Sequence, residues 1–289
     1  MNQQKFSKTQ FDRMTAGEKL ELFVQGYRLP QKRSKAEALE LLHTKIDRGK
    51  TPTVVRNFSL YWSAAASVTL IVLLTTVYLY TAPVQIIAGK GQHIENTLPD
   101  GSAVSVNAGS KITYSKSGFA DNRSLKLEGE AFFSVQKGKP FVVKTRLGTA
   151  EVLGTTLNVY ARGNEFAVSC LTGRVRVTAN SQHVILEPGE KAGLISGTLV
   201  KIVNIPTSDM AVWRAGEFHF DNLPLIVIFE EIERQFNVNI IATGIENRFF
   251  TGSFSNKNLN EVLETVCLPM KLEYEIRNGN KISIRAKKN

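Results

Sequence analysis

A long uncharged stretch constrains this chain more than any other feature. No Asp, Glu, Lys, Arg or His occurs between Arg56 and Lys90. The apolar centre of the stretch, residues 60–80, would form a helix of about 31 Å, the thickness of a bilayer's hydrocarbon core. Mostly polar sequence precedes it, which disfavours a signal peptide, and a buried core helix is the less favoured alternative at this length. Aromatic residues that suit the headgroup layer lie at both ends of the centre: Tyr61, Trp62, Tyr78 and Tyr80. The sequence therefore predicts one transmembrane helix over residues 57–82.

Flanking charge predicts the orientation of this helix. The residues leading up to it carry Lys45, Arg48, Lys50 and Arg56, whereas the residues just after it carry only Lys90. Because positive charge is retained on the cytoplasmic side of a membrane, the N-terminus is expected in the cytoplasm. We therefore expect a single-pass protein of the inner membrane, with everything after the helix in the periplasm of a Gram-negative cell.

The net charge reflects this division. The 289 residues carry a formal charge of +10 and a pI near 9.6, which would ordinarily suggest a nucleic acid or a membrane surface as partner. Residues 1–56 contribute +6, residues 57–89 contribute none, and the rest contribute +4. The basic balance is therefore mainly a topology signal, and no direct nucleic-acid binding is expected. Two cysteines make no disulfide framework, so Cys170 and Cys267 are expected to be buried thiols.

Residues 1–56 predict two short amphipathic helices. Thr15 with Glu18, and Ser34 with Glu37, have the spacing of capping boxes. Such short helices bury little surface alone, so their apolar faces are expected to bind a protein partner. A solvated arm held by anionic lipid is the alternative, and a DNA-binding helix-turn-helix is disfavoured because the connection is too long. The apolar faces comprise Leu20, Phe23 and Val24, then Leu39, Leu42 and Ile46.

Beyond the membrane helix, residues 83–205 alternate apolar and polar side chains with the period of a β-strand. Turn sequences such as Pro99-Asp-Gly101 and Pro188-Gly189 separate the strands, with no helical pattern between them. This pattern predicts an all-β domain, either a sandwich or a β-roll. The alternating pairs are Val104/Val106, Ile112/Tyr114, Leu125/Leu127, Phe141/Val143, Leu157/Val159, Val175/Val177 and Val184/Leu186.

Residues 206–289 predict a compact α+β domain of the order βαββαββ. A helix is expected to start near Asn222, and a second to begin at Leu259. Strands are expected at 217–220, 238–242, 249–254, 272–276 and 282–285, the last two joined by a turn at Asn278-Gly279. The first helix has an apolar face of Leu225, Ile228, Phe229, Ile232 and Phe236. The whole chain is therefore expected to be mainly β, with a helical N-terminal segment and one transmembrane helix.

Signatures of catalysis and metal binding are absent from the sequence. Gly49-Lys50-Thr51 resembles the end of a P-loop, but Thr44 occupies the position of its first glycine. There is no nucleophile elbow and no His-Glu-x-x-His motif, and the four histidines are scattered. We therefore expect no enzyme, no cofactor and no metal site. The layout favours a signal passed from the outer domains, through one helix, to a cytoplasmic partner.

Several segments of the chain resemble the FecR family of transmembrane anti-sigma factors. They occur in this order: Leu98-Pro-Asp-Gly-Ser102, Leu127-Glu-Gly-Glu-Ala-Phe-Phe133, Pro140-Phe-Val-Val-Lys-Thr145, Val152-Leu-Gly-Thr155 and Leu186-Glu-Pro-Gly-Glu190. Three more resemble the C-terminal domain of members common in Bacteroidetes, which is similar in plan to the short N-terminal domains of secretins and TonB-dependent transducers: Trp213-Arg-Ala-Gly216, Asn222-Leu-Pro-Leu225 and Gly252-Ser-Phe254. The resemblance covers residues 84–289, with Leu157 where the family often has Phe; residues 1–56 match mainly by position and helical character.

The resemblance implies a mechanism. Residues 1–56 would bind an extracytoplasmic-function (ECF) sigma factor through the two apolar faces. The periplasmic part would receive a signal from a TonB-dependent outer-membrane transducer, and regulatory proteases would then release the sigma factor to transcribe an uptake operon. The transducer can act only by binding one state of the receptor better than the other.

Two further interpretations accompany this mechanism. Some relatives are proposed to cleave themselves at a Gly-Thr bond by attack of the Thr hydroxyl on the preceding carbonyl, and Gly154-Thr155 matches that position; a structural Gly-Thr that begins a strand is the simpler interpretation. The rival function is a membrane-anchored periplasmic module that binds a ligand such as a glycan, without sigma regulation. A membrane-bound peptidase lacks any nucleophile–base pair in the sequence.

Overall fold

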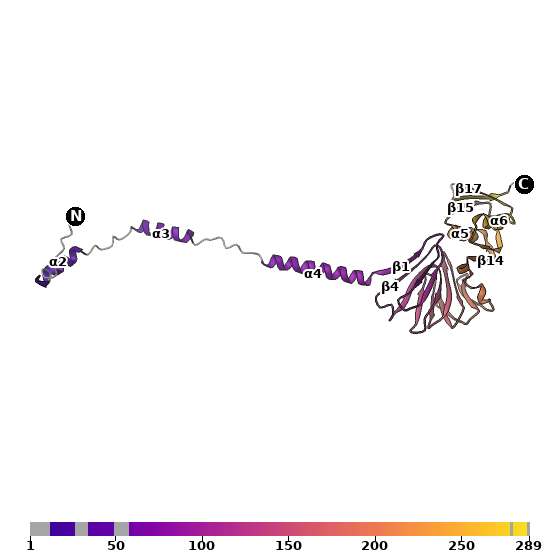
Figure 1. Ribbon diagram of the computed structural model, residues 1–289, viewed down its shortest axis with the longest axis horizontal. Helices are drawn as coiled ribbons and strands as arrows, with labels where there is room; N and C mark the ends of the chain where they lie inside the picture. The colour runs from indigo at the N-terminus through magenta and orange to yellow at the C-terminus, as the bar shows by residue number, and fades with distance from the viewer. Residues whose placement is uncertain (1–11, 27–33, 49–57, 278–279, 288–289) are drawn as a thin grey trace. The chain divides into compact units, whose positions relative to one another are not determined.

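Two N-terminal helices begin where the capping boxes lie. The computed structural model describes residues 12–26, 34–48, 58–277 and 280–287, and in it α2 spans Ala16–Gly26 and α3 spans Lys35–Arg48 (Figure 1). The backbone N–H and the hydroxyl of Thr15 both donate to the Glu18 carboxylate at 2.9 Å. The Glu37 N–H donates to the Ser34 hydroxyl at 3.3 Å. Both helix starts predicted from the sequence are therefore confirmed.

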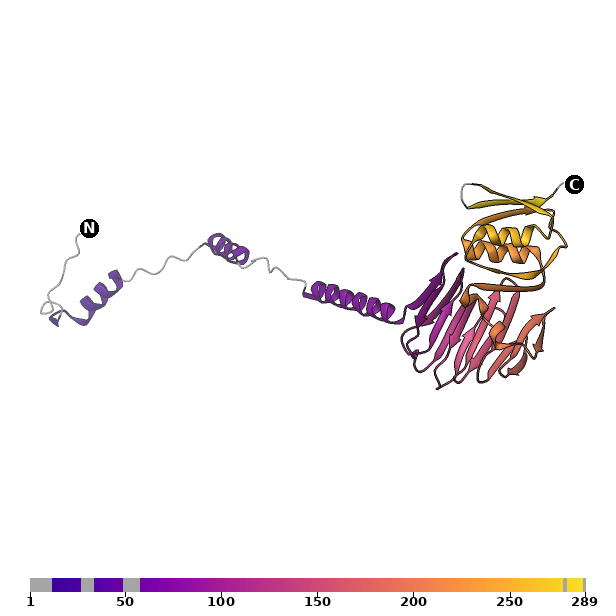
Figure 2. The same ribbon diagram turned by 45° about the vertical axis from the view of Figure 1, so that its right-hand side comes forward.

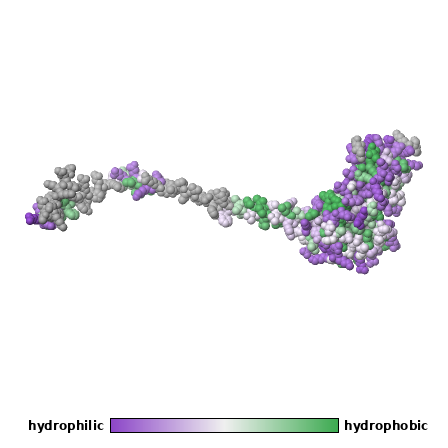
Figure 3. All heavy atoms as spheres, viewed as in Figure 1, coloured by the Kyte–Doolittle hydropathy of each residue, from purple (hydrophilic) through white to green (hydrophobic). Residues whose placement is uncertain are grey.

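The uncharged stretch forms helix α4, Phe58–Thr81. Within it, Trp62–Thr81 has the length and the mean hydropathy, 1.8, of a membrane span, and none of this segment is buried against the rest of the protein. Large apolar side chains are exposed along the helix, as a lipid-facing helix requires, and the face seen in Figure 3 carries several of them. The predicted range began at Asn57, which lies outside the described residues.

Residues 83–202 form two seven-stranded sheets that share one long strand, β5 (Arg123–Ser134). Pairing is antiparallel throughout except between β5 and β6. The first sheet runs β1 (Pro83–Ala88), β4 (Ser110–Ser115), β5, β6 (Phe141–Lys144), β7 (Thr149–Val152), β10 (Val175–Ala179) and β11 (Gln182–Leu186). The second runs β2 (Ile94–Thr97), β3 (Ala103–Val106), β5, β8 (Thr156–Arg162), β9 (Glu165–Cys170), β12 (Glu190–Ile195) and β13 (Thr198–Ile202).

Gly129 allows β5 to pass from one sheet to the other. Residues of β5 up to Glu128 pair with β4, whereas residues from Gly129 onward pair with β8. Gly129 has φ +105°, and a Cβ there would lie 2.6 Å from the Cβ of Ser110, so only glycine fits. The two sheets enclose one apolar core, to which every predicted alternating pair contributes, Val184 from its margin. The mainly β fold and its sandwich-like domain are thus confirmed.

A buried ion pair closes one end of this β domain. Arg123 lies 2.6 Å from the Asp100 carboxylate and donates further hydrogen bonds, each 2.7 Å long, to the carbonyls of Gln136 and Lys139. Burial would raise the pKa of Asp100, but hydrogen bonds from Ser102 and Arg123 outweigh it and lower that pKa. The Leu98-Pro-Asp-Gly-Ser102 segment therefore supplies the counter-ion that lets Arg123 lie in the interior.

The C-terminal residues form a second core with the predicted order βαββαββ. Two short 3-10 helices precede it, η1 (Thr207–Asp209) and η2 (Val212–Ala215), and α5 and α6 lie between two small sheets (Figures 1 and 2). The elements are β14 (Glu217–Pro224), α5 (Leu225–Phe236), β15 (Asn239–Thr243), β16 (Phe249–Ser255), α6 (Leu259–Cys267), β17 (Leu272–Arg277) and β18 (Lys281–Ala286).

Two details refine the expectations for this region. Strand β14 continues to Pro224 because Asn222 adopts a left-handed φ of 48° within a bulge, so α5 begins at Leu225 and not near Asn222. The predicted Asn278-Gly279 turn lies outside the described residues. Cys170 and Cys267 are buried thiols without a disulfide, as expected, and burial raises the pKa of each to about 11.

Candidate functional site at the inter-domain joint

The C-terminal core continues onto the outer face of the β domain. In β5, Ala131 and Phe133 point into the β core, whereas Phe132 points outward and packs in the C-terminal core with Trp213. The guanidinium of Arg214 lies 4.0 Å from the centre of the Phe132 ring, a cation–π contact. β5 is therefore buried on both faces here, and the C-terminal domain packs directly on the β domain. We call this contact region the inter-domain joint.

A chain of amide side chains crosses the joint. Asn107 and Asn158 of the β domain each donate a 2.8 Å hydrogen bond to the Glu130 carboxylate. Asn158 accepts a 3.1 Å hydrogen bond from the Trp213 indole N–H, and Asn107 accepts one of 3.0 Å from Gln235 on α5. Because each amide uses both its donor and its acceptor, the network fixes one relative position of the two domains.

Two carboxylates and two guanidiniums lie within the joint. Gln235 also donates to Glu231 at 2.7 Å, and Arg234 donates to the same carboxylate at 2.8 and 3.1 Å. Burial raises the pKa of Glu130, and the nearby Glu231 charge adds to this rise, against the opposing effect of the Asn158 hydrogen bond. Burial lowers the pKa of Arg162, although the charge of Glu231 opposes it. The joint thus contains two carboxylates and two guanidiniums, and burial makes the ionised form of Glu130 costly.

The β1–β2 loop supplies a second point of attachment. The Gly91 N–H donates to the Arg234 carbonyl at 2.7 Å, and the ring of His93 lies 2.9 Å from the Gln235 amide oxygen. The same His93 ring meets the Trp213 ring edge-to-face, with centroids 5.4 Å apart. The loop that follows β1, the first strand after the membrane helix, thus contacts the start of the C-terminal domain and its first helix directly.

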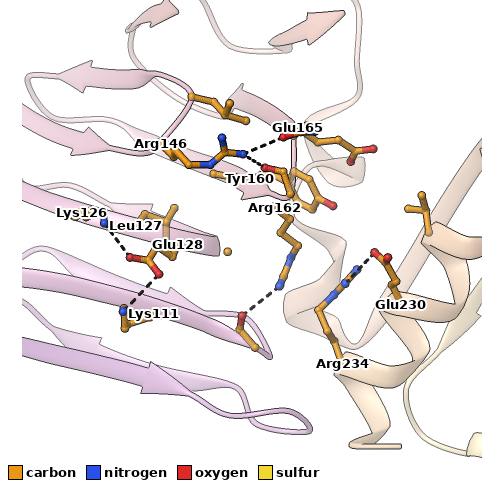
Figure 4. Close-up of a pocket in the computed structure, with 17 residues that line it drawn as sticks. Lys111, Lys126, Leu127, Glu128, Arg146, Tyr160, Arg162, Glu165, Glu230 and Arg234 are labelled. Atoms are coloured by element: carbon orange, nitrogen blue, oxygen red, sulfur yellow. Dashed lines mark hydrogen bonds and ion pairs between the residues drawn. The ribbon is translucent and has the colours of Figure 1, made fainter. Parts of the chain in front are cut away.

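A cleft of about 990 Å³ opens beside the joint, between the β domain and α5 (Figure 4). Its walls include eight charged side chains: Lys111, Lys126, Glu128, Arg146, Arg162 and Glu165 from the β domain, and Glu230 and Arg234 from α5. Among the residues that the structure describes, no three His, Cys, Asp or Glu side chains gather as they would around a metal ion.

The Gly154-Thr155 pair lies at the edge of the β core, away from these residues. Gly154 has φ +150°, and a Cβ there would lie 2.7 Å from the Cα of Lys137. Thr155 is buried, and its hydroxyl donates to the Arg174 carbonyl at 3.1 Å. A built Cβ on Gly173 would lie 2.8 Å from that hydroxyl. Close packing alone explains why glycine precedes Thr155.

The six residues expected to bind a partner are all exposed. Leu20, Phe23 and Val24 lie on α2, and Leu39, Leu42 and Ile46 lie on α3, with 52–71% of each side chain accessible. Each helix therefore presents an apolar face that the described part of the chain does not cover.

The residues of the joint were not anticipated from the sequence. Glu130 and Asn158 occupy positions that a period-2 pattern assigns to solvent, and Glu231 and Gln235 flank the apolar face of α5. One signal was present: Ala131, Phe132 and Phe133 are three consecutive apolar residues, which break the alternation and indicate a strand buried on both faces.

Comparison with known proteins gives concordant matches. Residues 84–176 match the family model described as FecR protein, and residues 217–284 match the one described as FecR, C-terminal. Two crystal structures, at 2.50 and 1.65 Å, of a protein from Parabacteroides distasonis ATCC 8503 described as an anti-sigma factor superpose with TM-scores of 0.66 and 0.65. Each is 29% identical and covers 71% of this chain and 100% of its own. No protein with a curated description matches the chain.

Proposed function

Because the chain belongs to the FecR family of anti-sigma factors, we propose that its N-terminal helices bind an ECF sigma factor in the cytoplasm. We further propose that a TonB-dependent outer-membrane transducer signals to the two folded domains in the periplasm. Helix α4 would connect these compartments as a single pass through the inner membrane, with regulatory proteases completing the release of the sigma factor.

The exposed apolar faces of α2 and α3 carry this proposal. Helices with several large apolar residues on one face are stable in water only when that face is covered, and each fully buried Leu, Val or Phe contributes about 1.5–3 kcal/mol. Leu42 and Phe23 are 57% and 71% exposed, and the described part of the chain does not cover them, which supports a partner protein as the molecule that does. A groove on a sigma factor is the partner that membership of this family supports.

The inter-domain joint supports the signalling half of the proposal. A transducer that binds one arrangement of the two periplasmic domains better than another shifts the balance between them. The Glu130 network holds a single arrangement, and it contacts the β1–β2 loop at His93, 12 residues beyond the end of α4 at Thr81.

Retention of the sigma factor by the full-length chain tests the proposal. The chain, solubilised in detergent, should co-purify with the sigma factor encoded in the neighbouring operon, and Phe23→Asp or Leu42→Asp should abolish retention. The alternative function is a periplasmic binding module. It would be correct if no sigma factor is retained, if both substitutions have no effect in cells, and if the chain binds glycan directly.

Self-cleavage at Gly154-Thr155 has a separate test. An acyl shift needs the Thr155 hydroxyl free to attack the Gly154 carbonyl carbon, whereas this hydroxyl donates to Arg174 in a closely packed corner. We therefore expect one intact band for the purified protein on a denaturing gel. Two fragments that Thr155→Ala abolishes would instead demonstrate cleavage.

A further inference from the structure

Two of the arginines that line the cleft beside the joint form no ion pair with another described residue. Its lining includes five cationic side chains and three carboxylates. Lys111 and Lys126 share one carboxylate, Glu128, at 3.4 and 3.0 Å, and Arg234 pairs with Glu230 at 3.6 Å and with the neighbouring Glu231 at 2.8 Å. Glu165 lies on the exposed rim. The two remaining cations, Arg146 and Arg162, contact no carboxylate within ion-pair distance in the described structure.

Both of these arginines contact neutral groups only. Arg146 donates to the carbonyl of Gly163 and to the side chain of Asn164. Arg162 donates to the carbonyl of Ala108 at 2.8 Å and to the hydroxyl of Ser110 at 3.2 Å, while its buried Nε–H has no partner. The negative charges of Glu231 and Glu130 oppose the lowering of the Arg162 pKa by burial, but neither carboxylate lies within ion-pair distance of Arg162. A guanidinium pairs most strongly with a planar anion that accepts two parallel hydrogen bonds.

The shape of the cleft favours an extended ligand. Pockets for small molecules are mostly apolar and enclose most of the ligand. Here apolar side chains such as Leu127, Leu147 and Val227 also line the cleft, but its rim residues Arg146, Asn164 and Glu165 are exposed, so the cleft is too open to enclose a small molecule. Figure 4 shows Arg162 of the β domain and Arg234 of α5 on facing walls of the cleft, so a ligand in the cleft touches both domains.

We propose that this cleft binds an acidic segment of a partner polypeptide, whose carboxylates pair with Arg146 and Arg162. The bound segment contacts α5 as well as the β domain, so it stabilises the arrangement that the joint holds. The site is distinct from α2 and α3, and its occupation does not depend on the binding of a sigma factor.

Fluorescence anisotropy with two labelled peptides tests this proposal on the full-length chain in detergent. The probes are a glycine-flanked hexaglutamate peptide and the matched hexaglutamine peptide. The glutamate peptide should bind at least tenfold more tightly than the glutamine peptide. The double variant Arg146→Gln/Arg162→Gln should reduce its affinity at least tenfold, whereas Lys116→Gln/Lys257→Gln should change it less than twofold. This control removes the same charge at two exposed cations outside the cleft.

The single variant Arg146→Gln should fold normally, because the Arg146 side chain is exposed. Its affinity for the glutamate peptide should fall about threefold, since one ion pair to the peptide is lost. Equal binding of both peptides, or equal losses in the cleft and control variants, overturns the proposal. Free glutarate that displaces the peptide at equal carboxylate concentration also overturns it, since the cleft would then be a site for small carboxylates. Loss of the sigma factor's binding leaves each of these results unchanged.

Discussion

Helices α3 and α5 have similar apolar faces, but only the face of α5 is buried. In α5, Ile228 and Ile232 are fully buried in the C-terminal core. In α3, Leu39, Leu42 and Ile46 have the same kind of spacing, yet more than half of each side chain is exposed. Strands β14, β15 and β16 contact α5, whereas the described part of the chain supplies nothing that covers α3. The same pattern thus contributes to the core in one helix and remains available for binding in the other.

The comparison separates stability from function. A polar substitution on the face of α5 should unfold a domain without touching any partner. A polar substitution on the face of α3 should leave every described element folded and remove a binding surface. Four substitutions test this difference between the two helices.

Ile232→Asp should unfold the C-terminal domain. It places a carboxylate in an apolar core at a side chain with no exposure, at a cost of more than about 4 kcal/mol. Urea denaturation followed by Trp213 fluorescence would measure the loss. Ile226→Asp is the matched control, since Ile226 lies on the same helix with 53% exposure and should change stability by less than about 0.5 kcal/mol. Equal effects of both substitutions would show that the face of α5 is not what holds the domain.

Leu42→Asp should weaken sigma-factor binding about 100-fold, corresponding to roughly 2.7 kcal/mol at a binding hot spot. Its thermal unfolding should match that of the unmodified chain because Leu42 contacts no core. Thr44→Asp, on the opposite side of α3, should bind normally in the same titration calorimetry. A large fall in melting temperature for Leu42→Asp would show that the apolar face of α3 also stabilises the folded chain, as the face of α5 does.

Asn158→Ala should loosen the joint by about 1–3 kcal/mol, because it removes one of the two hydrogen bonds to the buried Glu130 carboxylate and leaves the Trp213 indole N–H without its partner. The expected signature is faster hydrogen exchange in α5 with little change in the β core. Asn96→Ala, at an exposed position on β2, provides the control. Unchanged exchange in α5 would show that the joint does not depend on this amide.

Glu130→Gln should flatten the dependence of stability on pH. Because the pKa of Glu130 is raised in the folded state, its contribution is full below the ordinary carboxyl pKa of about 4.5 and is lost as the pH rises through the raised value. The difference in melting temperature, unmodified chain minus variant, should therefore fall between pH 5 and pH 8. A constant difference would show that Glu130 titrates normally.

Much of the fold was predictable because its signals are local. Period-2 alternation identified the inward side chains of β5 through Leu125 and Leu127, and helical spacing identified the buried face of α5. The bend at Gly129 was not predictable, since it depends on the close approach of Ser110 from a neighbouring strand. The start of helix α5 at Leu225 was also not predictable, because a bulge at Asn222 extends strand β14.

The joint was less predictable because its residues belong to two domains. Asn107 and Gln235 are 128 positions apart, and each is an ordinary surface residue within its own element. Only the docking of α5 on the β domain buries them. The exposed faces of α2 and α3 followed directly from local spacing, since no other described element contacts them.

Hydrogen–deuterium exchange of the full-length chain, with and without the ECF sigma factor, would show whether α2 and α3 form the surface that binds the sigma factor. If α2 and α3 provide the binding surface, their amides should become protected when the sigma factor is added, while those of α5 exchange as before. If protection is confined to the C-terminal domains, or if α2 and α3 gain none at saturating sigma factor, these two helices are not the binding surface.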